Sequence, residues 1–130
     1  MLVGHIGVGL AAKALEPRMK LGTMLAAAML VDILFFALML LGAEGIESGG
    51  QRFHFPFSHS LLSSFLLALV AALARGLWGG LRPRRHGAYW DGIALIAATV
   101  FSHWLLDFVV HGGDLPLYPG GAAISVRTAR

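Results

Sequence analysis

Residues 92–111 read GIALIAATVFSHWLLDFVVH, a run long enough to cross a lipid bilayer as one helix. Three polar residues stand in its second half: His103, Asp107 and His111. Their spacing of i, i+4 and i+8 places them along a single stripe of a helix. Lipid tolerates such groups only where they face a protein interior or a water-filled cavity and find partners there. The run therefore predicts a transmembrane helix whose polar stripe faces other parts of the protein.

The composition indicates a membrane protein of one domain. The chain has 130 residues, of which 57% are hydrophobic and 13% charged, about half the charged share of a soluble domain. There is no cysteine, which excludes disulfides, thiolate metal sites and cysteine nucleophiles. The net charge of +3 comes from basic residues placed between apolar runs, so no nucleic-acid partner is expected. No cleavable signal peptide is predicted, because residues 1–15 lack a basic n-region.

Three further segments are predicted to be helical. Leu21–Gly42 and Phe57–Trp78 each have the length of a membrane span. Leu2–Leu15 is shorter, and its glycines and alanines suit close helix contact in lipid, so we expect it to be a fourth span or a re-entrant helix. The fold class is therefore all-α, with a transmembrane domain over residues 1–111. Residues 112–130, which contain two prolines and a glycine pair, are expected to form an extended tail.

Charge orients these spans. The loop between the second and third segments holds Arg52 beside Glu44 and Glu47, whereas the other two loops are strongly basic. Under the positive-inside rule the basic loops are cytoplasmic and the acidic loop is outside. The cytoplasmic cations are Lys13, Arg18, Lys20, Arg75, Arg82, Arg84 and Arg85.

With this orientation, polar residues from four segments fall in the outer half of the membrane. Asp32 stands among apolar residues in its span, and a central Asp costs about 2.5–3.5 kcal/mol to insert. Imidazole and carboxylate groups are ligands for a divalent metal, most plausibly zinc. The predicted metal ligands are His5, Asp32, His54, His59, His103, Asp107 and His111.

Each of these residues also has a simpler reading. The polar stripe on residues 92–111 could serve to hydrogen bond with a neighbouring helix instead of binding a metal. Asp32 could be protonated and hydrogen bonded to another helix. His54 and His59 could be interfacial histidines, and His5 could be solvated. Ser58 is a candidate cap for the third helix, which would leave His59 facing inward.

Taken together, these residues resemble the membrane-bound metal-dependent hydrolase family, also described as YdjM-like or LexA-binding inner-membrane hydrolases. The matching positions are an N-terminal His, an Asp at the end of a hydrophobic run, a His before a Ser-His-Ser, and a Ser-His-x-x-x-Asp helix. In this chain they are His5, Asp32, His54 with Ser58-His59-Ser60, and Ser102-His103 with Asp107. The family commonly has a second Asp two positions after the first, where this chain has Leu34.

The resemblance and the ligand types together imply a hydrolase acting on an ester or phosphoester, with a small-molecule or lipid-like substrate. A metal would activate water, and a group not bound to the metal would accept the proton. The predicted catalytic residues are Asp32, His54 and Asp107. Two other readings stay open: an ion- or proton-binding transporter, and haem ligation by paired histidines. Whether the chain forms a homo-oligomer is also left open.

Overall fold

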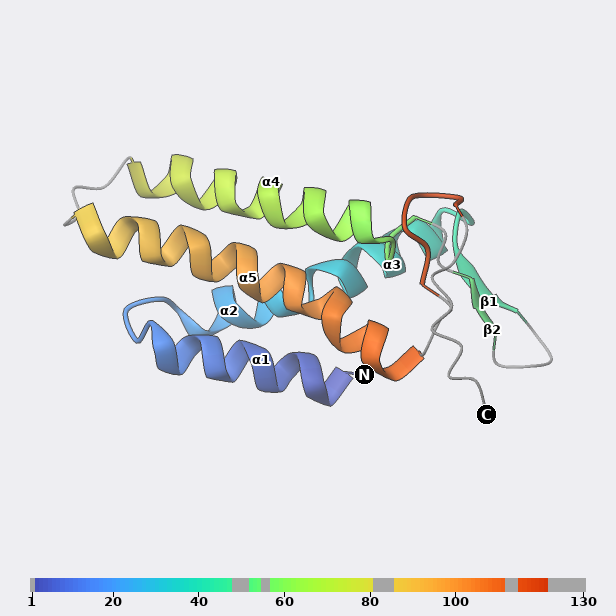
Figure 1. The fold of residues 1–130 in the computed structure, drawn as a ribbon, viewed down its shortest axis with the longest axis horizontal. Helices are drawn as coiled ribbons and strands as arrows, with labels where there is room; N and C mark the ends of the chain where they lie inside the picture. The colour runs from blue at the N-terminus through green and yellow to red at the C-terminus, as the bar shows by residue number, and fades with distance from the viewer. Residues whose placement is uncertain (1, 48–51, 55–56, 81–85, 112–114, 122–130) are drawn as a thin grey trace.

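The computed structural model describes residues 2–47, 52–54, 57–80, 86–111 and 115–121, which form five helices and one short hairpin (Figure 1). The helices confirm the predicted all-α class, and the hairpin is an addition to it. The elements are α1 (Leu2–Leu15), α2 (Leu21–Ala28), α3 (Leu30–Leu40), β1 (Gly45–Glu47), β2 (Arg52–His54), α4 (Leu61–Gly80) and α5 (His86–His111).

The helices run alternately up and down one bundle. The α1–α2 connection lies at the same end as the close of α4 and the start of α5, and α3 and the hairpin lie at the other end (Figure 1). α4 packs against α5, and α1 packs against α2 and α5. The buried apolar core lies between these helices and consists of Ala12, Met19, Met24, Ala27, Ala68, Ile96 and Val100.

Two helices are long and apolar enough to cross a membrane, over Leu61–Trp78 and Gly92–Val110. α2 and α3 pass the same test together if the bent pair is taken as one span, and α1 is a shorter apolar helix. Large apolar side chains of α4 are exposed on the outside of the bundle, a surface that water would not favour. They are Leu62, Phe65, Leu66, Leu69, Val70, Leu73 and Leu77.

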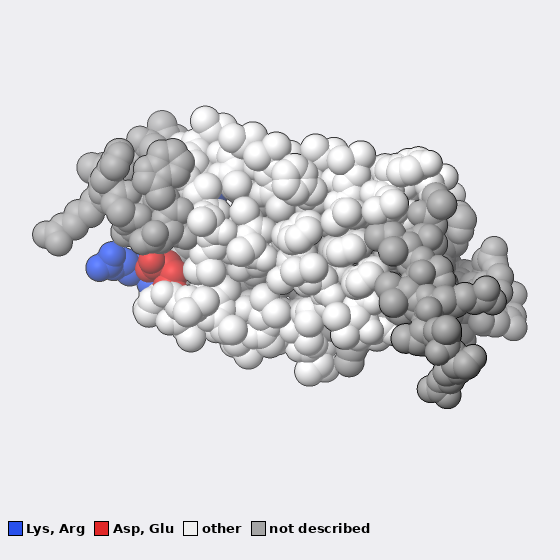
Figure 2. All heavy atoms as spheres, viewed as in Figure 1, with Lys and Arg blue, Asp and Glu red and all other residues white. Residues whose placement is uncertain are grey.

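On the face drawn in Figure 2, the charged side chains of the described residues lie toward one end of the bundle. Figure 2 shows that the Lys, Arg, Asp and Glu side chains visible on its face, among the described residues, gather at the end with the α1–α2 connection. The middle of that face carries none of them, which is compatible with a location in a membrane.

The prediction of one continuous helix over residues 21–42 was wrong, because the segment bends by 57° at Met29. In a continuous helix the Ala28 carbonyl would accept a bond from the Asp32 N–H. Here that carbonyl accepts a hydrogen bond from Nδ1 of His103, at 2.8 Å. A side chain inserted into the backbone ladder is a recognised cause of a sharp kink. The bend thus coincides with a contact between distant helices, which the local sequence does not reveal.

The third helix begins four residues later than predicted, at Leu61, and its cap is Ser60 instead of Ser58. The Ser60 hydroxyl accepts the backbone N–H of Ser63 at 3.1 Å, the bond expected between an N-cap and the third helical residue. Phe57 to Ser60 form a turn, so His59 precedes the helix.

The described part of the predicted tail, Leu115–Gly121, is non-helical and lies against the start of α4. The backbone N–H groups of Leu61 and Leu62 donate to the carbonyls of Pro116 and Leu117, at 3.0 and 3.1 Å. The first N–H groups of a helix have no partner within it, so the tail stabilises this helix end. The rest of residues 112–130 lies outside the described residues.

Gly9 lets α1 approach α2 closely. A Cβ atom at this position would lie 2.9 Å from Leu25 Cδ2, 3.2 Å from Leu25 Cα and 3.3 Å from the Met24 carbonyl oxygen. Since two of these atoms belong to backbone, they cannot move aside easily. Of the small residues predicted to allow close helix contact, Gly9 therefore lies at the contact with α2. A Cβ atom added at Gly7 would have nothing within 4 Å.

We expect Gly9→Val to lower the free energy of unfolding by about 1–3 kcal/mol, because the added side chain forces α1 away from α2. Thermal unfolding in detergent, followed by circular dichroism, measures the effect. Gly7→Val is the matched control, since it adds the same side chain to the same helix in open space. Equal melting temperatures for the two variants would contradict this helix contact.

Candidate metal centre

Five of the seven predicted ligands come together at the end of the bundle opposite the α1–α2 connection. His103 and Asp107 are on α5, and His59 is in the turn that precedes α4. His5 comes from the first turns of α1, and Asp32 comes from α3, directly after the bend. Residues up to 102 positions apart in the sequence therefore meet at one place.

Two carboxylates and two imidazoles form a closed ring of contacts. Nε2 of His59 lies 3.6 Å from Oδ1 of Asp32 and 3.4 Å from Oδ2 of Asp107. Nε2 of His103 lies 3.4 Å from the same two oxygens. Nitrogen and oxygen atoms thus alternate around a common centre. Asp32 comes from α3, His103 and Asp107 come from successive turns of α5, and His59 comes from the turn before α4.

These distances fit ligands that share an ion. Adjacent ligands of a tetrahedral zinc, each about 2.0–2.1 Å from the metal, are roughly 3.3 Å apart. A hydrogen bond between a charged imidazole and a carboxylate would be shorter, about 2.7–2.9 Å. In addition, Nε2 of His103 is buried and makes no hydrogen bond with any described residue. A buried nitrogen in that position could bind an ion or a water.

The ligand atoms form two overlapping sets around His103. His5, His103 and Asp107 make one, and Asp32, His59 and His103 make the other, with ligand atoms within 4.8 Å of one another in each set. These buried or half-buried groups could hold a metal ion. The donors are all nitrogen and oxygen, as the absence of cysteine requires.

In both imidazoles of the ring, the Nδ1 atom lies within hydrogen-bond distance of another protein group. Nδ1 of His103 donates to the Ala28 carbonyl, so Nε2 is the nitrogen that faces the carboxylates and that a metal would bind. Nδ1 of His59 lies 2.8 Å from the Ser58 hydroxyl, and the edge of Phe35 packs against the His59 ring. Such outer contacts fix the tautomer and orientation of metal-binding histidines.

His5 supports Asp107. Its Nε2 donates to Oδ1 of Asp107 at 3.2 Å, while Oδ2 of the same carboxylate faces His59 and His103. The His5 ring also stacks on the His103 ring, with centroids 3.6 Å apart and planes within 6°. In this arrangement His5 orients a ligand, and it remains close enough to be one itself.

Glu44 positions the turn that carries His59, a role that sequence reasoning missed, since Glu44 was noted only as an acidic residue of the outer loop. Its Oε1 accepts the backbone N–H groups of Phe57 and Ser58, at 2.8 and 2.7 Å. Glu44 and Ser58 are both buried. The carboxylate thus satisfies two backbone donors in a turn that no helix stabilises.

Asp32 is the most exposed of the five residues at the site. The side chains of His5, His59, His103 and Asp107 are at most 6% exposed, whereas that of Asp32 is 22% exposed. Asp107 therefore forms the floor of the site, and Asp32 lies at its accessible edge. A small molecule would approach the ring next to Asp32.

Comparison of the chain with protein-family models, with curated proteins and with solved structures finds no match. The resemblance to membrane-bound metal-dependent hydrolases therefore depends on the pattern of His and Asp residues alone.

Two predicted ligands are not placed. His54 is the last residue of β2 and His111 is the last residue of α5, but their side chains lie outside the described part of the structure. Their roles stay predictions.

We expect Glu44→Ala to weaken metal binding by about 10- to 100-fold, the range found when outer contacts of a metal ligand are removed. The reason is that the His59 turn loses its two backbone hydrogen bonds. A titration of the detergent-solubilised protein against a competing chelator measures this affinity. Glu16→Ala is the control, because Glu16 also accepts a backbone N–H, that of Arg18, but at the far end of the bundle. Unchanged affinity in Glu44→Ala would rule out this positioning role.

Proposed function

We propose that this protein is an integral membrane hydrolase that uses a divalent metal, most plausibly zinc, to cleave an ester or phosphoester. The substrate is a small or lipid-like molecule at the outer face of the membrane. The observation that carries the proposal is the ring of two imidazole nitrogens and two carboxylate oxygens spaced 3.4–3.6 Å apart.

The proposed topology has four spans: α1, the bent α2–α3 pair, α4 and α5. Lys13, Arg18, Lys20 and Arg75 lie in or beside the loops at one end of the bundle, and the His and Asp ring lies at the other. The positive-inside rule makes the basic end cytoplasmic, in a bacterial-type inner membrane. The metal centre then lies toward the outer face, where a substrate can enter from the outer leaflet.

A bound divalent ion would polarise the substrate oxygen and activate water at neutral pH. Residues of the chain would hold the ion and accept the proton. His59, His103 and Asp107 would hold the ion, with Asp107 fixed in turn by His5. Asp32, the accessible carboxylate, would either complete the ligand set or accept the proton from the attacking water.

The family resemblance supports the hydrolase part of this proposal. The residues that carry it and that the structure describes are the same ones that meet in the site: His5, Asp32, His59, His103 and Asp107. The missing second Asp, replaced by Leu34, favours a single metal over a pair.

Metal transport is the second candidate function, because intramembrane His and Asp residues also line ion pathways. Toward the basic end, however, the described core consists of apolar residues such as Met24, Ala68, Ile96 and Val100. A polar pathway through the bundle would have to pass this layer. The one-sided site therefore favours an enzyme over a transporter.

We expect purified protein to bind a divalent metal in stoichiometric amount, and His103→Ala or Asp107→Asn to weaken that binding at least 100-fold. Each change removes a ligand from the centre of the ring. Elemental analysis and chelator titration measure the result. Ser102→Ala is the control, because Ser102 is the direct neighbour of His103 and bonds the Thr99 carbonyl within α5. Wild-type metal binding in both ligand variants, with intact helical content, would end the proposal.

We expect the metal-loaded protein to hydrolyse chromogenic carboxyl or phosphate esters, and chelated protein to lose this activity. The Ser102→Ala control should retain it, and Asp107→Asn should not. Stoichiometric metal without turnover of any ester tested, combined with metal flux in proteoliposomes, would replace the enzyme with the transporter.

A further inference from the structure

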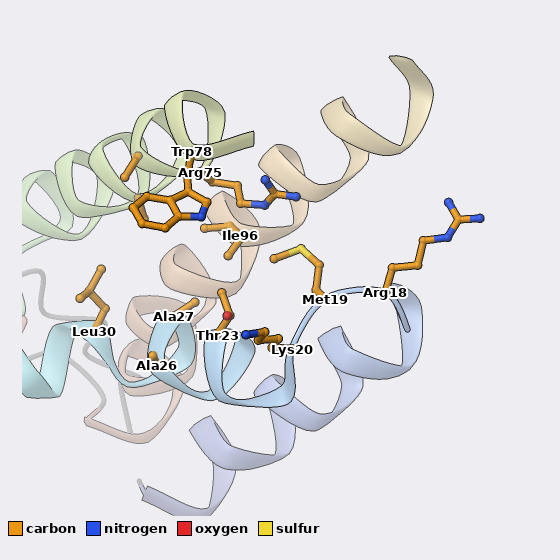
Figure 3. Close-up of a pocket in the computed structure, with 12 residues that line it drawn as sticks. Arg18, Met19, Lys20, Thr23, Ala26, Ala27, Leu30, Arg75, Trp78 and Ile96 are labelled. Atoms are coloured by element: carbon orange, nitrogen blue, oxygen red, sulfur yellow. The ribbon is translucent and has the colours of Figure 1, made fainter. Parts of the chain in front are cut away.

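A cavity of about 600 Å³ lies at the basic end of the bundle, away from the metal centre (Figure 3). Two of its walls come from α2 and α4, with Leu30 at the start of α3 closing one end. Thr23, Ala26 and Ala27 line one wall, and Ala71, Ala74, Arg75 and Trp78 line the other. The α2 residues follow the spacing i, i+3, i+4 and the α4 residues the spacing i, i+3, i+4, i+7, so each set lies on one face of its helix.

The small side chains of these two faces leave the cavity between them. In membrane proteins, faces rich in alanine normally pack in close contact. Here α2 packs on α1 and α5, α4 packs on α5, and Ile96 of α5 lines the space between them. A space of this size and with these apolar walls falls in the range of pockets that bind small amphiphilic ligands.

Positive charge is concentrated at one end of the cavity. Figure 3 shows Lys20 and Arg75 at the end opposite Leu30, with Arg18 extending outward from the same end. Within the described part of the chain, neither Lys20 nor Arg75 pairs with an acidic residue. Two donors for an anion are therefore available above an apolar groove.

Arg75 is held in place by its neighbours. A Cβ at Gly92 would lie 3.3 Å from Arg75 Nη2 and 3.7 Å from its Nε, so the guanidinium lies against the backbone of α5. Trp78, one turn further along α4, is 70% exposed at the rim. A tryptophan beside cations is typical of the level of the lipid headgroups.

We propose that this cavity binds one anionic phospholipid of the cytoplasmic leaflet. Its phosphate contacts Lys20 and Arg75, with Arg18 nearby, and an acyl chain lies between Ala26–Ala27 and Ala71–Ala74. The lipid fills a space that hydrocarbon-exposed helices would otherwise leave as a void, and its charge matches the rim. This site is separate from the metal centre and does not depend on hydrolase activity.

Native mass spectrometry of the protein in detergent, titrated with phosphatidylglycerol or phosphatidylcholine of equal chain length, tests this binding. We expect one phosphatidylglycerol to bind at least tenfold more tightly than phosphatidylcholine. A cation near a membrane surface contributes about a fivefold preference for anionic lipid, so Arg75→Gln should weaken phosphatidylglycerol binding by about that factor. Arg52→Gln is the charge-matched control, since Arg52 is in β2 at the opposite end of the bundle.

A second pair of variants separates the cavity from general charge attraction. Ala74→Leu narrows the groove without changing charge and should also weaken lipid binding at least fivefold. Ala98→Leu adds the same side chain at an exposed position of α5 that does not line the cavity, and should have no effect.

Three results would overturn the proposal. They are equal binding of the two lipids, equal losses in Arg75→Gln and Arg52→Gln, or lipid binding unaffected by Ala74→Leu. Inorganic phosphate displacing phosphatidylglycerol completely at millimolar concentration would also overturn it, because the site would then recognise a free anion. Metal content measured in the same samples shows whether any failure extends to the metal centre.

Discussion

The contacts of Asp32 and Asp107 with the surrounding imidazoles are the constraint on which the rest of this structure depends. Inserting each central Asp into a membrane costs about 2.5–3.5 kcal/mol, and burying a carboxylate without a partner would cost more free energy. Structural zinc sites in small peptides contribute about 10–16 kcal/mol at neutral pH, more than two such penalties. A bound ion would therefore make the placement of both acids favourable.

Much of the site could be predicted from the sequence, because charged residues inside apolar runs have few acceptable environments. The spacing of His103 and Asp107 predicted one stripe on one helix, and along this stripe His103 contacts Asp32 while Asp107 contacts His59. The distribution of basic residues predicted that the polar groups share one end of the bundle. These inferences depend on hydrophobic periodicity and charge alone, which a single sequence displays.

The features that the sequence did not predict all depend on contacts between distant segments. The bend at Met29 has no proline or glycine near it and coincides with the bond between His103 and the Ala28 carbonyl. The start of α4 was misplaced because Ser58 and Ser60 are equally good caps by composition, and the Glu44 carboxylate occupies the backbone N–H of Ser58. The role of Pro116 as an acceptor for α4 likewise requires the tail to return to the bundle.

The bend links the two ends of the molecule. Beyond it, α3 contacts α4 and carries Asp32 to His59, so the ring closes. Before it, α2 packs against α1 and α5 instead, and its alanine face stands apart from α4 across the cavity. His103 contacts the Ala28 carbonyl at the bend through Nδ1 and faces the two carboxylates through Nε2. A single imidazole thus joins the ring of contacts to the junction between α2 and α3.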